Sequence, residues 1–160
     1  MDDDHNKTLA WQGWAEEERK FVLEMQHPYA ELVVSGKKTI ETRAYPLPDA
    51  LLNVKIEILQ SSKGQDGVSA LPSTFPLQET TKVRRIGWVT FNKCIEYKSK
   101  EEFESDAEKH LVDPNSAYGW NDERSMFGWV IHNFQKEDAK NEEGSIAVRR
   151  MRSLFEIITG

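Results

Sequence analysis

The segment from His27 to Pro46 constrains the fold more than any other stretch, because it combines the signals for a helix and for a charged strand. Pro28 suits the first turn of a helix, where its missing N–H has no intrahelical bond to lose. Gly36 stands where a helix C-terminus favours a residue that adopts positive φ. The residues from Lys37 to Tyr45 then alternate in the manner of a β-strand. The sequence therefore predicts a short helix at 29–35 that turns directly into a strand.

Glu41 and Arg43 would share one face of that strand, and Lys38 lies beside them at the glycine turn. One interpretation is an exposed ion pair, which contributes little to stability. A second is a binding site, in which the two cations hold a phosphate or a base carbonyl and Glu41 accepts from an exocyclic amine or a ribose hydroxyl. A third is a catalytic site, in which Arg43 lowers the pKa of Lys38, so that the amine acts as base or nucleophile and Glu41 transfers protons. The second and third interpretations both require a cleft at this position.

The same residues carry a resemblance to a known family. A glycine, a lysine, a glutamate and an arginine stand at fixed spacing as Gly36-x-Lys38-x-x-Glu41-x-Arg43, after Pro28-Tyr29-Ala30. This pattern resembles the signature of the ASCH domain family, whose fold is similar to that of the PUA domain, and the resemblance covers Phe21 to Phe134. It implies an α+β fold, a small mixed β-barrel of PUA-like type with two or three peripheral helices. Glu41 is the form that looks usual in the larger, eukaryote-like group of the family.

The resemblance also implies a function. ASCH domains are inferred to bind RNA, and certain small bacterial members hydrolyse N4-acetylcytidine with a catalytic lysine that matches Lys38. Their catalytic threonine falls where this chain has Glu41, and their second catalytic glutamate would be Glu96 or one in the helix that follows Ser99. We therefore expect this motif to bind RNA or a modified nucleoside. One alternative is a hydrolase of a modified cytidine or of RNA, with Lys38 and Glu41 as the catalytic residues. A second alternative is a protein-interaction module that uses the acidic N-terminal residues.

Alternating and apolar runs predict five further strands. They are Phe21–Met25, Asn53–Leu59, Arg84–Tyr97, a strand that begins at Met126, and Leu154–Ile158. The Arg84–Tyr97 stretch is either one long strand or a bulged pair, and Gly87 inside it indicates a bulge or a close backbone approach. Ser99 and Glu102 form a capping box, which predicts the start of a helix. That helix would place Phe103, Ala107 and His110–Leu111 on its apolar side.

Polar stretches set the expected domain boundaries. Residues 1–19 form an acidic N-terminal arm, whose two tryptophans either dock on the barrel or stack on a base. Residues 20–160 form the ASCH/PUA-like domain. Within it, residues 60–82 lack periodicity and are rich in Gly, Pro and Ser, which predicts a flexible insertion. The charged residues at 136–145 favour a solvated turn.

Aromatic and basic residues supply the rest of the predicted site. A planar base needs stacking surfaces, and the candidates are Tyr45, Tyr118, Trp120 and Trp129, with core positions as the alternative. The predicted ligand-binding set is Gly36, Lys38, Glu41, Arg43, Tyr45, Tyr118 and Trp120. Further basic residues form either a track for a nucleic-acid backbone or a solubilising edge. These residues are Lys82, Arg84, Arg85, Arg149, Arg150 and Arg152.

The composition excludes several classes of protein. The 160 residues carry a net charge of −6 with a pI near 5.3, which argues against a generic, charge-driven nucleic-acid binder but leaves room for a small basic groove. Cys94 is the only cysteine, so an intramolecular disulfide and a cysteine-only metal site are impossible, and we expect it to be a buried apolar residue. No second histidine stands at metal-binding spacing from His110. We expect no metal, no cofactor and no membrane partner, a monomer, and a location in the cytosol or nucleus.

Overall fold

The structure is a computed structural model that describes residues 19–62, 65–77, 83–140 and 145–159. Within these ranges the elements are, in chain order, β1 (Lys20–Gln26), α2 (Tyr29–Val34), β2 (Ile40–Arg43), the 3-10 turn η1 (Asp49–Leu51), β3 (Ile56–Ser61), β4 (Thr74–Pro76), β5 (Val83–Tyr97), α3 (Lys100–Ser105), α4 (Ala107–His110), β6 (Met126–Lys140), β7 (Ser145–Met151) and β8 (Leu154–Thr159). The arm predicted at 1–19 lies outside the described residues, apart from Arg19. Among the described residues no helix is long and apolar enough to span a membrane.

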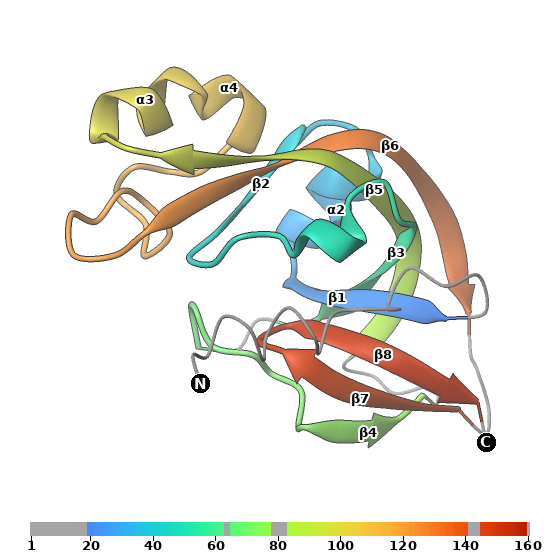
Figure 1. Ribbon diagram of the computed structural model, residues 1–160. Coiled ribbons are helices and arrows are strands. Elements are labelled where there is room, and N and C mark those ends of the chain that lie inside the picture. The colour runs from blue at the N-terminus through green and yellow to red at the C-terminus, as the bar shows by residue number, and fades with distance from the viewer. Residues whose placement is uncertain (1–18, 63–64, 78–82, 141–144, 160) are drawn as a thin grey trace.

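The described strands form one sheet that curls into a half-barrel (Figure 1). Its strand order is β2-β6-β5-β3-β1-β8-β7-β4. β1 and β3 run parallel, and each of the other neighbouring pairs is antiparallel. α2 packs on the concave side of the curl, whereas α3 and α4 lie outside it. This architecture confirms the predicted α+β fold of PUA-like type.

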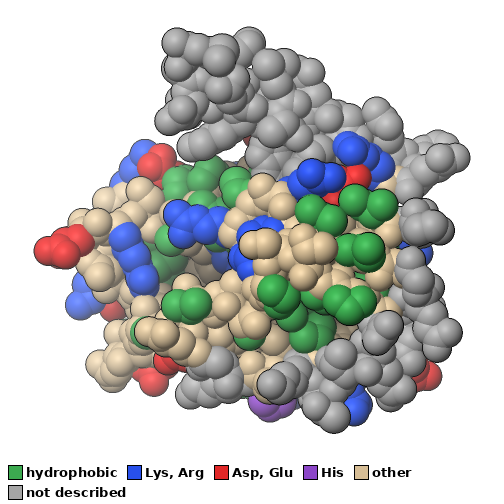
Figure 2. All heavy atoms as spheres, turned by 90° about the horizontal axis from the view of Figure 1, so that it is seen from below, with side chains coloured by type: hydrophobic (Ala, Val, Ile, Leu, Met, Phe, Trp, Pro, Cys, Tyr) green, Lys and Arg blue, Asp and Glu red, His purple; other side chains and the backbone are tan. Residues whose placement is uncertain are grey.

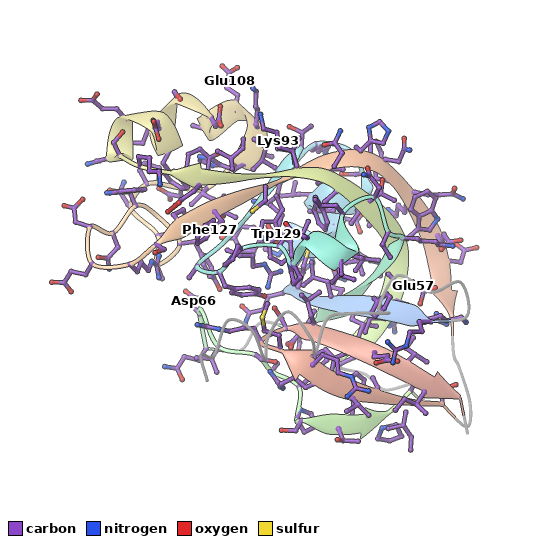
Figure 3. The ribbon with its side chains drawn as sticks, viewed as in Figure 1. Glu57, Asp66, Lys93, Glu108, Phe127 and Trp129 are labelled. Atoms are coloured by element: carbon purple, nitrogen blue, oxygen red, sulfur yellow. The ribbon has the colours of Figure 1, made fainter. Side chains whose placement is uncertain are left out.

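The described residues form three apolar cores, and two of them lie on opposite faces of β1. The main core lies on the concave side, where α2 packs against the sheet and Trp129 is fully buried near the centre (Figure 3). The second core lies between β1, β7, β8 and the segment at 71–77. β1 is therefore buried on both faces, with Leu23 in the main core and Val22 in the second one.

The long hairpin of β5 and β6 gives the sheet its curl. Its register shifts at three points, and such bulges increase the bend of a strand. One of them lies at Gly87, where φ is +157° and an added Cβ would lie 2.1 Å from the carbonyl oxygen of Gln135. The bulge or close backbone approach that the sequence predicts at Gly87 is thus confirmed.

The predicted helix after Ser99 starts correctly but is wrong in its length. The Ser99 hydroxyl accepts a hydrogen bond from the backbone N–H of Glu102 at 3.1 Å, as a capping box requires. The helix then breaks at Asp106 into α3 and α4. Phe103 and His110 are buried as predicted. Ala107 and Leu111 are exposed, contrary to the prediction, because the break changes the register of the second helix and Leu111 ends it in the left-handed conformation.

Three further stretches carry more regular structure than the sequence predicts. The turn predicted at 136–145 is wrong in its first half, because β6 continues to Lys140 and pairs with β5. Two of the predicted basic residues, Arg149 and Arg150, belong to β7, whereas Arg152 lies in the turn after it. The predicted insertion at 60–82 contains the end of β3 and the short strand β4, which pairs with β7. The flexibility of this insertion stays a prediction.

Candidate functional site

The motif residues lie where the chain leaves α2 and enters β2. Gly36 takes φ +80° after the helix, so the residues that follow turn back toward the sheet. The backbone N–H of Lys38 donates to the carbonyl of Leu32 at 2.9 Å, which fixes the turn. An added Cβ at Gly36 would lie 2.4 Å from Cζ of Phe134, so this exposed ring would have to turn away. Gly36 therefore shapes the site without lining it.

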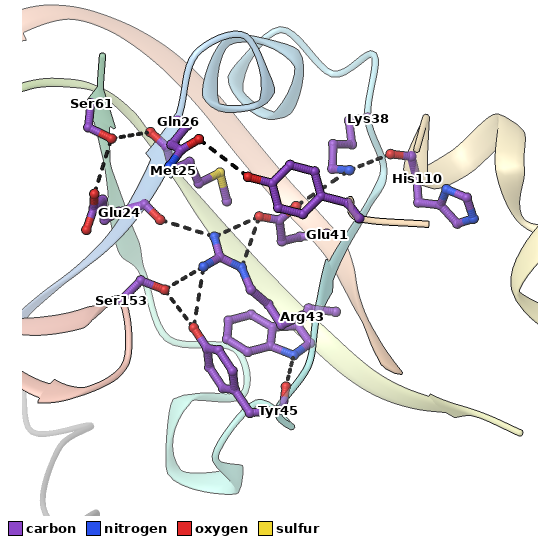
Figure 4. Close-up of polar contacts among 12 residues, drawn as sticks. Glu24, Met25, Gln26, Lys38, Glu41, Arg43, Tyr45, Ser61, His110 and Ser153 are labelled. Carbon is purple, nitrogen blue, oxygen red and sulfur yellow. Dashed lines mark hydrogen bonds and ion pairs between the residues drawn. The ribbon is translucent and has the colours of Figure 1, made fainter. Parts of the chain in front are cut away.

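Glu41 stands between two cations in the interior. Its Oε2 accepts from Arg43 Nη2 at 2.8 Å and from Nε at 3.2 Å, and its Oε1 lies 3.5 Å from Lys38 Nζ (Figure 4). Lys38 is 1% exposed and Glu41 is 5% exposed. Lys38 Nζ also donates to the carbonyl of His110 at the end of α4. The three charges that the sequence places together are thus brought together, in a buried cluster and not on an exposed face.

Arg43 links the cluster to two other parts of the fold. Its Nη2 donates to the carbonyl of Glu24 in β1 at 3.2 Å. Its Nη1 donates to the hydroxyl of Ser153, in the turn between β7 and β8, and lies 3.4 Å from the hydroxyl of Tyr45. The hydroxyls of Tyr45 and Ser153 are themselves 2.7 Å apart. A planar guanidinium suits this role because it donates in several directions at once.

Burial and charge shift the pKa values of the cluster. Burial lowers the pKa of Lys38, and Arg43 lowers it further, while Glu41 partly offsets both. Burial alone would raise the pKa of Glu41, but Arg43 and Lys38 outweigh it and hold that pKa below its usual value. Glu41 is therefore the anion of the cluster, and its Oε1 keeps an acceptor position that is not used by Arg43.

A pocket of about 510 Å³ opens beside this cluster. Its volume falls within the roughly 300–1,000 Å³ that is typical of small-molecule sites. Its lining includes Lys38, Glu41, Arg43 and Tyr45 from the predicted set. The cleft that both the binding and the catalytic interpretation require is present.

One wall of the pocket comes from the predicted insertion. Glu24, 3% exposed, accepts from the hydroxyls of Ser61 and Ser69 and from the backbone N–H of Ala70, the last at 2.7 Å. Asp66 lies at the tip of this wall (Figure 3). The carboxylate of Glu24 thereby fastens the segment at 67–70 against β1.

The predicted aromatic residues separate into two groups. Tyr45 and Tyr118 line the pocket. Tyr118 makes an edge-on contact with Tyr29, a further pocket residue that sequence reasoning did not select. Trp120 lies outside the pocket lining, 6.1 Å from the ring of Phe103. Trp129 is a core residue whose Nε1 donates to the carbonyl of Tyr45 at 3.2 Å.

The remaining candidates lie away from the pocket or have other partners. Glu96 is exposed and pairs with Lys98 at 2.7 Å. His110 donates from Nε2 to the carbonyl of Phe103 and accepts at Nδ1 from the N–H of Val112, so its ring is neutral. Cys94 is half-buried, and burial raises the pKa of its thiol. No cluster of three metal-ligating side chains occurs among the residues that the structure describes.

Two of the predicted basic residues reach the pocket, and three others among the described residues do not. Arg149 and Arg152 line it. Arg85 pairs with Glu57 at 2.5 Å, and Arg150 pairs with Glu156 at 2.9 Å. Arg84 is exposed and is absent from the pocket lining. Lys82 lies outside the described residues.

A comparison with protein families identifies this arrangement. The family model of the ASCH domain matches residues 23–146, which is most of the chain. The chain belongs to the ASCH domain family. ASCH domains have a PUA-like fold of an RNA-binding family. A comparison with curated proteins gave no match.

Solved structures of similar fold include an ASCH protein from Zymomonas mobilis, with 18% identity and a TM-score of 0.53, over 76% of this chain and 73% of that chain. A serine-to-alanine variant of the same protein gives a TM-score of 0.52 over the same shares, again with 18% identity. A tyrosine-to-phenylalanine variant gives 0.52 over 76% of this chain and 75% of that chain, with 18% identity. At this identity the likeness shows the fold of the ASCH domain and nothing finer.

Sequence reasoning on this ASCH domain missed Glu24 and Ser153 as site residues. Glu24 stands in an apolar strand, and its partners lie 37 to 46 positions away along the chain. Ser153 is one hydroxyl in a basic turn, and its role depends on Arg43, which is 110 positions away. A buried carboxylate beside Met25 in a strand is the one signal that could have selected Glu24, since such groups need a partner.

Proposed function

We propose that this ASCH domain binds RNA or a modified nucleoside, with the base held at the floor of the pocket by Glu41 and Arg43. The observation that carries the proposal is the position of Glu41, whose carboxylate is held ionised by Lys38 and Arg43 beside a 510 Å³ pocket. Its Oε1 supplies an acceptor for an exocyclic amine, as found on cytosine and adenine. Tyr45 and Tyr118 supply faces on which a base can stack.

The binding test is an NMR titration with the four ribonucleosides, N4-acetylcytidine and short single-stranded RNAs. We expect the amide shifts to centre on residues 38–45 and on Tyr118. Tyr118→Ala weakens binding because it removes a pocket face. Trp120→Ala is the matched control, since this aromatic lies two positions away but outside the lining. Equal effects of the two variants, or shifts elsewhere on the surface, would contradict the assignment of the pocket.

A second candidate function is hydrolysis of a modified cytidine or of RNA. It is favoured by the lowered pKa of Lys38, which makes the neutral amine more accessible, and by the nearby carboxylate of Glu41. Mass spectrometry of the titration samples tests it: a product that forms with the wild type and not with Lys38→Met supports catalysis. Ligand that binds and stays intact supports a binding domain. The protein-interaction function predicted for the arm at 1–19 stays a prediction.

A further inference from the structure

The pocket carries positive charge that its own carboxylates do not balance. Two carboxylates line it, and each already has partners for its charge. Glu41 forms ion pairs with Lys38 and Arg43, and Glu24 accepts hydrogen bonds from two hydroxyls and an N–H. Three more arginines line the same pocket, namely Arg124, Arg149 and Arg152. Among the described residues none of the three forms an ion pair with a carboxylate. This excess stands out in a chain whose net charge is −6, and it favours an anionic ligand.

Two of these arginines are structural. Arg124 donates from Nη2 to the carbonyls of Ala117 and Gly119, at 2.7 Å and 3.1 Å. Arg149 donates to the carbonyls of Leu71 and Arg152 and stacks on Phe155, with Cζ 4.9 Å from the ring centroid. The N–H groups of Arg124 and Arg149 already donate to backbone carbonyls in loops, so neither side chain is the best candidate for a ligand contact.

Arg152 differs from both. In the described part of the chain its guanidinium makes no hydrogen bond or ion pair, and it lies over the ring of Tyr45, 5.3 Å from Cζ to the centroid. Its backbone takes φ +51°, in a region where a residue with a Cβ costs roughly 1–2 kcal/mol. Arg149 holds this conformation by its bond to the Arg152 carbonyl. Arg152 is the first residue of the two-residue turn between β7 and β8, and hairpin turns of this length favour positive φ at that position.

Tyr45 connects Arg152 to the floor of the pocket. Its hydroxyl lies 2.7 Å from Ser153 and 3.4 Å from Arg43 Nη1, whereas its ring faces Arg152. One tyrosine side chain therefore separates the Glu41–Arg43 floor from a guanidinium that has no hydrogen-bond partner among the described residues. A nucleotide has the same layout, with a base edge at one end and a phosphate at the other, joined by the ribose.

The Tyr29–Tyr118 wall of the pocket also has cations beside it. Lys38 Nζ lies 5.6 Å from the centroid of the Tyr29 ring, and Arg124 donates to the carbonyls of Ala117 and Gly119 on either side of Tyr118. Both cations already have other partners, which leaves Arg152 as the candidate for a ligand contact. On the face formed by β4, β7 and β8, Lys and Arg side chains lie near the middle, among apolar ones (Figure 2).

We propose that Arg152 binds the phosphate of the ligand, so that the pocket takes a phosphorylated nucleotide or a strand of RNA in preference to an uncharged nucleoside. This inference rests on the proposed function, because it assumes that a base occupies the floor. Guanidinium suits phosphate because it donates two parallel hydrogen bonds. The ribose and base contacts stay with Tyr45, Glu41 and Arg43.

The test compares each ribonucleoside with its 3′- and 5′-monophosphates and with a single-stranded tetranucleotide, by calorimetry on the full chain at about 0.1 M salt. We expect the phosphorylated forms to bind about tenfold or more tighter than the nucleosides. In Arg152→Gln this ratio falls toward one, while the affinity for the nucleoside stays unchanged. Arg150→Gln is the matched control, since Arg150 is two positions away, pairs with Glu156 and does not line the pocket.

The outcomes separate the two proposals. Equal affinity for nucleoside and nucleotide, or a phosphate preference that survives in Arg152→Gln, overturns the role of Arg152 and leaves the proposed function intact. A folded Arg152→Gln protein that loses the nucleoside and the nucleotide alike also overturns it. No binding of any probe by the wild type refutes the proposed function itself. An Arg152 effect on the tetranucleotide alone supports a backbone phosphodiester as the partner, and an effect on the monophosphates supports a terminal phosphate.

Discussion

Replacing Glu41 by glutamine tests whether the buried cluster is held together by its negative charge. Removing one member of a buried ion pair usually costs about 3–5 kcal/mol. Here we expect about 3 kcal/mol, the lower end of that range, because both cations keep neutral acceptors: Arg43 the carbonyl of Glu24, and Lys38 the carbonyl of His110. For a domain of this size the melting temperature would fall by roughly 6–12 °C.

The dependence on pH makes this prediction specific. The pKa of Glu41 is lowered in the folded protein, so its stabilising contribution is complete above the unfolded value of about 4.3 and is lost as pH falls toward the folded value. Glu41→Gln lacks this contribution at every pH. In urea unfolding, the stability gap between wild type and variant should be constant from about pH 7 to pH 5.5 and should shrink below about pH 4.3. A gap that is the same at pH 3.5 and pH 7 would refute the ionised state of Glu41.

Glu96→Gln is the control for this experiment. Glu96 also pairs with a lysine, but the side chains of Glu96 and Lys98 are 47% and 68% exposed. Exposed pairs contribute at most about 1 kcal/mol. A loss as large as that of Glu41→Gln would show that burial is not what makes the cluster important.

Three further predictions concern the surroundings of the cluster. Gly36→Ala should lower the free energy of unfolding by about 1–2 kcal/mol from strain at positive φ, because the exposed Phe134 ring can turn away, and thermal melts should show a similar loss in a background with Phe134→Ala. Glu24→Gln should speed hydrogen exchange at the N–H of Ala70 without changing exchange in β6; unchanged exchange would mean that this carboxylate does not fasten the wall. Burial lowers the pKa of His110, so stability should fall as pH drops below about 6.5, and His110→Gln should lose that part of the slope in chemical denaturation from pH 7.5 to 5.

The elements that sequence predicts well are those whose signals are local. β1, α2, β2 and β8 follow from alternation and from the helix stop at Gly36, and the start of α3 follows from the Ser99 cap. The convergence of Lys38, Glu41 and Arg43 follows from their spacing alone. Such features need no knowledge of the distant chain.

The elements that sequence misses depend on a partner far along the chain. The charged end of β6 is a strand because it pairs with β5, where Gly87 opposes Lys136 and Arg85 opposes Lys140. β4 is a strand because β7 lies beside it. Its own three residues, Thr74–Pro76, carry no strand pattern that could be recognised. Propensity is too weak to predict these elements, since tertiary pairing overrides it.

The position of the cluster explains why binding and stability are hard to separate in this domain. β2 is an edge strand, and it does not pair with β1 or β8. Arg43 nevertheless joins β2 to the carbonyl of Glu24 in β1 and to Ser153 beyond β7. Side chains therefore close the open side of the half-barrel, where the backbone ladder does not, and the same side chains form the floor of the pocket.

Substitutions at the floor should thus reduce stability and ligand binding together, because each removes a bond that closes the barrel. Arg152 lies outside this network, since its guanidinium makes no hydrogen bond or ion pair among the described residues and lies over the ring of Tyr45. Its substitution should change the ligand preference at nearly constant melting temperature. A large loss of stability in Arg152→Gln would show that the cation–π contact with Tyr45 also helps to close the barrel. Arg152 would then not be independent of the Glu41–Arg43 floor.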